Sequence, residues 1–262
     1  EAIEHFAFAV SQDERDAYAL THWGLALSQL SRLAEAGERF EQAVQADPHD
    51  VYALNHLALT RYQLGEVDKA LQAFEQALVS EPTDGYTLSN LGLVLTALER
   101  FEEAAERFHA ALASDPRDVY SRNNLGIVLA RLRRFEEAVA QLQQALEQMP
   151  DYAEGHFNLA LAHYELRQFE TAVHHFERAL SLEPELLAAR GNLALTLAHL
   201  GDVEGSRKQL EEVQRLSKAQ GQPAYAEELG KEVDGILAVP AGKKSAPASI
   251  APKKTGKKPK KK

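Results

Sequence analysis

The sequence predicts an all-α fold, an α-α superhelix in which one helical hairpin is stacked many times along the chain. Two observations lead to this prediction. Five prolines recur 34 residues apart, at Pro48, Pro82, Pro116, Pro150 and Pro184. When the chain is aligned on them, small and large apolar residues recur at the same places between successive prolines. Such a fixed period indicates a single supersecondary unit copied along the chain.

Six complete units follow a partial one, residues 1–16, which corresponds to the second helix of a hairpin alone. The complete units are 17–50, 51–84, 85–118, 119–152, 153–186 and 187–220. Positions within a unit are numbered 1 to 34, with proline at 32. Apolar or small residues at positions 4, 7, 8, 11 and 14, and again at 17, 20, 21, 24, 27 and 28, follow helical spacing. Each unit is therefore predicted to be two helices, and no strand pattern occurs in the repeats.

The ends of the predicted helices carry recognisable signals. Aspartate at position 34 predicts an N-cap for the first helix of the next unit. The four aspartates at this position are Asp16, Asp50, Asp84 and Asp118. Proline at position 32 follows the second helix and prevents its continuation. Small residues at positions 8 and 20 let the two helix backbones approach, and large residues at position 24 fill the space beside them.

The turn inside the hairpin has a variable sequence. Two units carry glycine there, Gly65 and Gly201. The other four carry Ser31, Glu99, Arg133 and Arg167. The sequence therefore indicates no single turn type.

Beyond the sixth unit the pattern changes. Tyr225, Leu229, Val233 and Leu237 recur at four-residue steps and predict one capping helix within 221–239. Residues 240–262 contain nine lysines and no acidic residue, with Ile250 as the single large apolar side chain. Such a segment cannot bury enough surface to offset its ordering entropy, so it is predicted to be a disordered tail.

The charge balance separates the tail from the rest. The chain has a net charge of −10, to which the tail contributes +9, so the body carries −19. An acidic body is a poor match for nucleic-acid phosphates. Only the tail is a candidate for weak contact with nucleic acid or an anionic membrane. The alternative is that it solvates the protein or folds back on the acidic body.

Other global features constrain the class of protein. The chain has no cysteine, which excludes a disulfide framework. It has no run of about 18 apolar residues that would span a membrane. It begins with Glu1 inside half a unit, so we expect a fragment whose signal peptide, lipid anchor or upstream domain lies outside this sequence. A cytoplasmic location is the default expectation.

The repeats resemble the tetratricopeptide repeat family. Its signature is a 34-residue unit with W-L-G-Y-A-F-A-P at positions 4, 7, 8, 11, 20, 24, 27 and 32. Leucine or tryptophan at 7, glycine or alanine at 8 and mostly alanine at 20 match over about 220 residues. The chain departs from the signature at position 4, which is Leu20, Leu54, Leu88, Arg122, His156 or Arg190. It also departs at position 11, which lacks tyrosine.

The resemblance implies that positions 2, 5, 6, 9, 12 and 13 of the first helices line a concave groove. Candidate binding residues are those at positions 2, 6 and 9. The tyrosines at position 2 are Tyr52, Tyr86 and Tyr120, besides Tyr18. Position 6 supplies His56, Asn90, Asn124, Asn158 and Asn192. Position 9 supplies Leu59, Leu93, Ile127 and Leu161. Such a groove suits an extended or helical peptide, because amides pair with peptide groups and tyrosines add rigid contact.

Two known binding modes of the family can be compared with these residues. The asparagine column is similar to that of the O-linked N-acetylglucosamine transferase superhelix, where the same position holds the substrate backbone. The alternative is that the amides bond between neighbouring helices and the aliphatic residues pack between them. The carboxylate clamp for chaperone C-termini needs lysine and asparagine at positions 5 and 9, and the required lysines are absent, so that partner class is excluded.

The sequence contains no motif for catalysis, a cofactor or a metal. Glycine-rich phosphate loops and nucleophile elbows are absent. His174 and His175 lie near His163, but adjacent histidines on a helix point about 100° apart and chelate one metal poorly. The sequence therefore predicts a noncatalytic scaffold with a protein or peptide partner and no small-molecule substrate. The alternatives are the targeting region of a larger enzyme, such as a glycosyltransferase, or an adaptor tethered by its lysine-rich tail.

Overall fold

The computed structural model describes residues 2–239, so the predicted disordered tail, residues 240–262, lies outside the described residues. Fourteen α-helices and no strand occur in the described part, which confirms the all-α prediction. The chain divides into two compact units, Glu1–Ser121 and Arg122–Lys262. None of the helices between residues 2 and 239 combines the length and the apolar character needed to cross a bilayer.

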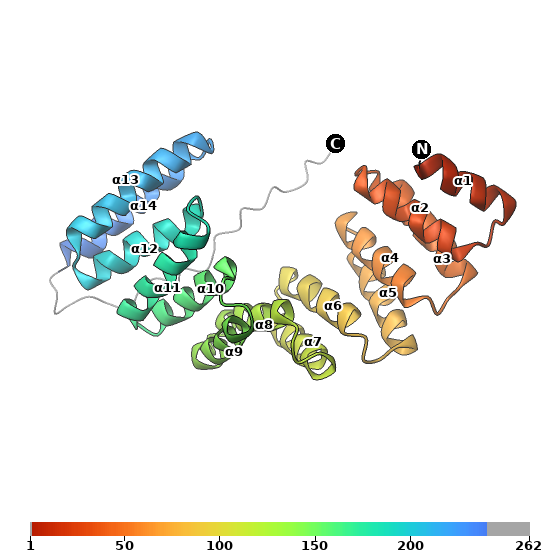
Figure 1. Cartoon of the computed structure of the whole chain (residues 1–262), viewed down its shortest axis with the longest axis horizontal. Coiled ribbons are helices and arrows are strands. Elements are labelled where there is room, and N and C mark those ends of the chain that lie inside the picture. Colours follow the sequence, from red (N-terminus) through yellow and green to blue (C-terminus); the bar gives the residue numbers. More distant parts are fainter. Residues whose placement is uncertain (1, 240–262) are drawn as a thin grey trace. The chain divides into compact units, whose positions relative to one another are not determined.

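Unit 1 is a series of helical hairpins (Figure 1). Its helices are α1 (Ala2–Gln12), α2 (Ala17–Gln29), α3 (Leu33–Ala46), α4 (Val51–Gln63), α5 (Val67–Ser80), α6 (Gly85–Ala97) and α7 (Phe101–Ser114). α8 (Val119–Arg131) begins in unit 1 and continues into unit 2. The closest partners are α2 with α3, α4 with α5 and α6 with α7, as expected for hairpins.

Unit 2 continues the same construction. Its remaining helices are α9 (Phe135–Gln148), α10 (Ala153–Glu165), α11 (Phe169–Leu182), α12 (Leu187–Leu200), α13 (Val203–Ala219) and α14 (Pro223–Ala238). α14, the predicted capping helix, packs against both α12 and α13. One continuous core joins α10 through α14 and contains Tyr164, Phe176, Leu193 and Leu229.

The hairpins are held by a large residue on the second helix that packs against a small one on the first. Phe40, Phe74 and Phe108 are completely buried. A methyl group added at Gly92 would lie 2.8 Å from the Phe108 ring, so the ring touches the backbone of α6 directly. The predicted pairing of positions 8 and 24 therefore sets the spacing between the two helices.

Aspartate caps begin the first helices, as predicted. The Asp50 carboxylate accepts a hydrogen bond from the Ala53 N–H at 3.0 Å. Asp16, Asp84 and Asp118 make the corresponding bonds to the backbone three residues later. The last two repeats lack this cap, because Tyr152 and Leu186 occupy the position.

The turn inside the hairpin is the same in every repeat, which the varied sequence did not indicate. Its residue is left-handed at Ser31, Glu99, Arg133 and Arg167, with φ of 59° to 62°, and at Gly65 and Gly201. The same two hydrogen bonds surround it, such as Arg32 N–H to Leu27 C=O and Ser31 N–H to Ser28 C=O. This pattern is a Schellman motif. It is fixed by backbone geometry and packing, so non-glycine residues are held there at a cost.

Candidate functional site

Four tyrosines stand at the second position of successive first helices in unit 1. Their side chains are 72%, 48%, 51% and 60% exposed for Tyr18, Tyr52, Tyr86 and Tyr120. α2 is a neighbour of α4, and α4 of α6, so equivalent positions on these helices form a row. Tyr120 follows on α8, where the adjacent Ser121 hydroxyl contacts Ser89 of α6. We call these four residues the tyrosine strip. Large aromatic rings repeatedly exposed at one register position make this strip a candidate contact surface.

On each of these helices, the residues at positions 6 and 9 lie on the same face as the tyrosine at position 2. Residues four and seven apart share one face of a helix, which places Tyr52, His56 and Leu59 together on α4. The Tyr52 and His56 rings meet edge to face with centroids 4.5 Å apart. On α6 the corresponding residues are Tyr86, Asn90 and Leu93, and Leu93 is 45% exposed. The predicted tyrosine, histidine and leucine positions of unit 1 therefore lie on common helix faces.

His56 forms the inner edge of this face. Its ring stacks on Phe40 of the preceding hairpin, with centroids 5.6 Å apart. Burial lowers the pKa of His56, and the nearby Asp50 charge opposes that shift only in part. Its Nε2 is buried without a hydrogen-bond partner among the described residues. His56 is therefore a neutral aromatic surface at pH 7 rather than a cation.

A carboxylate precedes each tyrosine of the strip by two residues. These are the capping residues Asp16, Asp50, Asp84 and Asp118. In each, one oxygen accepts all the capping bonds from the backbone or from Thr87. The other oxygen has no hydrogen-bond partner among the described residues. Each exposed tyrosine of the strip thus follows, by two residues, a carboxylate whose second oxygen can still accept a hydrogen bond.

The predicted asparagines occupy different environments. Asn158 donates from Nδ2 to Asn123 Oδ1 at 3.0 Å, a bond between neighbouring first helices. Asn192 is only 7% exposed and donates to its own helix at Ala188 C=O. Asn90 has a buried Nδ2 with no partner among residues 2–239. Asn124, with Ile127 and Leu161, is half-buried.

Position 5 differs from the expectation that it lines the groove. Asn55 and Asn123 are almost completely buried. The Asn55 amide donates to the Thr87 hydroxyl of the next first helix. Ser89 and Ser121 make the corresponding contact one repeat later. Position 5 therefore joins adjacent first helices and is largely buried, whereas positions 2, 6 and 9 in unit 1 are exposed or partly exposed.

In unit 2 the structure assembles a histidine stack that includes His156, whose role the sequence did not reveal. His175 on α11 lies between His156 and His163 on α10, with ring centroids 5.3 and 5.7 Å away. His156 Nε2 lies 2.9 Å from the Pro150 carbonyl, and its Nδ1 lies 3.1 Å from His175 Nδ1. His156 therefore carries its proton on Nε2 and accepts one from His175 at Nδ1.

This stack favours neutral imidazoles. Burial lowers the pKa of His175 to about 4 and also lowers that of His156. His163 Nδ1 lies 2.5 Å from the Gln168 amide oxygen, which can only accept a hydrogen bond, so Nδ1 of His163 carries a proton. No cluster of three or more potential ligands with metal-site geometry occurs within residues 2–239. His156 and His175 are therefore a neutral, hydrogen-bonded pair within the hairpin.

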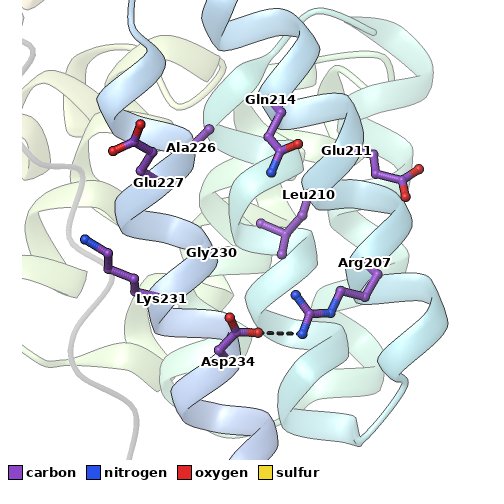
Figure 2. Close-up of a pocket in the computed structure, with 9 residues that line it drawn as sticks. All are labelled: Arg207, Leu210, Glu211, Gln214, Ala226, Glu227, Gly230, Lys231 and Asp234. Atoms are coloured by element: carbon purple, nitrogen blue, oxygen red, sulfur yellow. Dashed lines mark hydrogen bonds and ion pairs between the residues drawn. The ribbon is translucent and has the colours of Figure 1, made fainter.

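A cleft of about 570 Å³ lies between α13 and α14 (Figure 2). Leu210 and Ala226 are buried at this cleft, and Gly230 leaves open space beside them. An Arg207–Asp234 ion pair with a 2.6 Å contact spans the two helices. The remaining lining residues are polar and include both acidic and basic side chains, so the cleft by itself favours neither a cationic nor an anionic ligand.

Comparisons with known proteins agree with this architecture. Models described as tetratricopeptide repeat match residues 21–85, 90–153, 153–186 and 186–219. Among solved structures, YrrB, described as a TPR protein with an unusual peptide-binding site, is 24% identical with a TM-score of 0.59. That match covers 71% of this chain and 96% of YrrB. No curated protein sequence matches the chain.

Two further structures show the same fold. PilF of Pseudomonas aeruginosa has a TM-score of 0.69 at 19% identity, covering 83% of this chain and 99% of its own. MamA of Desulfovibrio magneticus RS-1, from residue 41 to its end, has a TM-score of 0.61 at 20% identity. It covers 65% of this chain and 96% of its own. At these identities the likeness concerns the fold alone.

Proposed function

The chain belongs to the tetratricopeptide repeat family, and from that premise we propose that it is a noncatalytic scaffold that binds a segment of another protein. The contact surface is the tyrosine strip of unit 1 with the position 6 and 9 residues beside it. The observation that carries this proposal is the exposure of Tyr18, Tyr52, Tyr86 and Tyr120 at one register position. A monomer gains nothing from exposing four aromatic rings in a row.

The chemistry of this surface suits a peptide. Tyrosine supplies a rigid ring with a polar hydroxyl, which gives contact area at low entropic cost. His56 adds a neutral ring and Leu93 an exposed aliphatic patch. The peptide-binding site for which YrrB is described supports the same use of the fold.

The predicted residues of unit 2 are considered by themselves. Asn124, Ile127 and Leu161 are half-buried on α8 and α10. Asn158 and Asn192 already donate to protein acceptors. We assign Asn158 to holding neighbouring first helices together, which is the alternative named for the asparagine column, and Asn192 to a bond within its own helix.

The proposal is tested by selecting binding peptides from a random library on the full chain. The strip variant carries Tyr52→Ser and Tyr86→Ser. We expect it to bind the selected peptides at least about tenfold more weakly, as for interface aromatic residues elsewhere. Affinities are measured by fluorescence anisotropy, and the thermal midpoint should change little because both rings are exposed.

The matched control is Val79→Ser on α5. Val79 is 80% exposed, so the variant removes an exposed apolar side chain from a second helix of the same unit. Peptide affinity should be unchanged in this control. Selected peptides that bind the double tyrosine variant as well as the wild type would refute the proposed surface.

A further inference from the structure

We propose that the segment bound by the tyrosine strip is rich in lysine or arginine, with its cations held between the tyrosine rings and the capping aspartates. This inference rests on the proposed function and names the class of partner. The juxtaposition that carries it is local. Each exposed tyrosine follows, by two residues, an aspartate that has one carboxylate oxygen without a hydrogen-bond partner among the described residues.

The distribution of charge favours a cationic partner on this unit. Residues 1–121 contain 21 acidic and 8 basic residues, a net charge of −13. Residues 122–239 contain 18 acidic and 12 basic residues, a net charge of −6. The unit with the tyrosines thus carries most of the negative charge of the body. A field of this sign speeds the encounter with a basic segment and disfavours an acidic one.

The negative charge of Asp50 acts on the helix face that carries Tyr52. Asp50 raises the pKa of His56, although burial lowers it by more. The His56 ring in turn contacts the Tyr52 ring. A lysine or arginine that approaches Tyr52 therefore meets the negative face of an aromatic ring and a nearby carboxylate together. Cations bind favourably over such rings.

The two inner repeats are the best placed for this contact. The outer aspartates, Asp16 and Asp118, directly follow Arg15 and Arg117 in the chain. The inner ones follow residues other than lysine or arginine, His49 before Asp50 and Thr83 before Asp84. The Asp50–Tyr52 and Asp84–Tyr86 pairs therefore have no lysine or arginine directly before the aspartate in the chain.

The spacing of the repeats suggests how such a segment is presented. α2, α4 and α6 are consecutive neighbours, and packed helices lie about 8–10 Å apart. A polyproline II segment rises about 9 Å over three residues. Lysine at every third residue of an extended, proline-containing segment would thus meet successive repeats. A peptide of four Lys-Pro-Ala triplets is a suitable probe, and its Gln-Pro-Ala counterpart is the uncharged match.

The experiment measures binding of both peptides to the full chain at low ionic strength. The charge variant carries Asp50→Asn and Asp84→Asn, because asparagine also caps helices and preserves the fold. We expect the lysine peptide to bind at least tenfold more tightly than the glutamine peptide. The asparagine variant should weaken the lysine peptide about fivefold. Tyr52→Ala with Tyr86→Ala should weaken it by fivefold or more.

The matched control carries Glu38→Gln and Glu102→Gln. Both glutamates are exposed on second helices of the same unit, so the net charge changes equally. This control should change the affinity less than twofold. An equal loss in the two charge variants would show diffuse attraction and overturn the proposed contact. Equal binding of the two peptides would overturn it as well.

The outcomes also separate this inference from the proposed function. If library-selected peptides need the tyrosines while the lysine peptide does not bind, the cationic partner is refuted and the docking surface stands. If no peptide depends on the tyrosines, both fail. Gly230→Leu fills the cleft between α13 and α14, where a side chain meets open space. Loss of lysine-peptide binding in this variant would place the segment there and overturn the assignment to the strip.

Discussion

Replacing Gly92 by alanine tests whether the contact between positions 8 and 24 sets the spacing of a hairpin. A methyl group at Gly92 would lie 2.8 Å from two atoms of the Phe108 ring. Ordinary contacts between carbon atoms are about 3.5–4.0 Å, so the ring or the helices must shift by more than about half an ångström. Overpacking of this kind costs about 1–3 kcal/mol.

The same substitution also brings a gain, because alanine favours a helix over glycine by about 1 kcal/mol. Gly37→Ala isolates that gain. Gly37 lies buried inside α3, and a methyl group there would have its nearest neighbour, Thr60 Cγ2, at 3.6 Å. This is ordinary contact, so Gly37→Ala should stabilise the protein by about 0.5–1 kcal/mol. The difference between the two variants is then about 1–3 kcal/mol, which is the overpacking cost.

The assay is urea unfolding followed through Trp23, the single tryptophan of the chain. Trp23 lies in α2, within the same unit as both glycines. The free energies of unfolding are compared between variants whose m-values equal that of the wild type. If Gly92→Ala proves as stable as Gly37→Ala, the Phe108 contact does not fix the helix spacing and the packing argument is refuted.

Four other changes have definite expected outcomes. Ser31→Gly should stabilise by up to about 1 kcal/mol by relieving a left-handed serine, read from the thermal midpoint. A double-mutant cycle of Asn158→Ala and Asn123→Ala should give a coupling of about 1 kcal/mol in urea unfolding, whereas additive losses would contradict their bond. Asp84→Ala should cost about 1 kcal/mol and Asp84→Asn much less, compared by melting. Because the pKa of His175 is lowered to about 4, its contribution to the free energy of unfolding should be fully present above about pH 6.5 and should fall as the pH drops towards 4. A wild-type stability that does not change over this pH range, or a pH profile that His175→Leu leaves unchanged, would contradict this.

The fold could be predicted from the sequence because its period, caps and packing residues are local signals. Proline at position 32 and aspartate at position 34 mark helix ends wherever they occur. The turn inside the hairpin could not be predicted in the same way. Arg133 and Arg167 do not favour a left-handed conformation, yet both adopt it. The hydrogen bonds of the Schellman motif and the packing of the two helices impose the turn, and these are properties of the folded hairpin.

The candidate site could be predicted only in part. Exposure of the tyrosines follows from helical phase, since position 2 lies away from the core positions 4, 7 and 8. The environment of an amide does not follow from phase alone. Asn158 and Asn90 share position 6, and each has an asparagine at position 5 of the preceding repeat, but only Asn158 donates to it.

The difference between these two amides lies at position 3 of the same helix. Asn55, the position 5 residue that precedes Asn90, donates its amide to the Thr87 hydroxyl. The residue equivalent to Thr87 beside Asn158 is Gly155, which offers no hydroxyl. Asn123 has no such hydroxyl beside it, and its Oδ1 accepts from Asn158, whereas the Oδ1 of Asn55 has no partner among the described residues. The bonding of the two amides thus differs together with the residue at position 3 of the same helix.

The same dependence on neighbours explains why the binding surface should be sought at position 2. Position 5 is used in contacts between first helices, as Asn55 with Thr87 shows. Position 6 is divided between such contacts and stacking, as in Asn158 and His56. Position 2 follows the N-cap, where aspartate already satisfies the backbone, and its side chains in unit 1 are exposed. Packing does not dictate the residue at such a position, so the large ring found there four times is the basis on which we propose recognition.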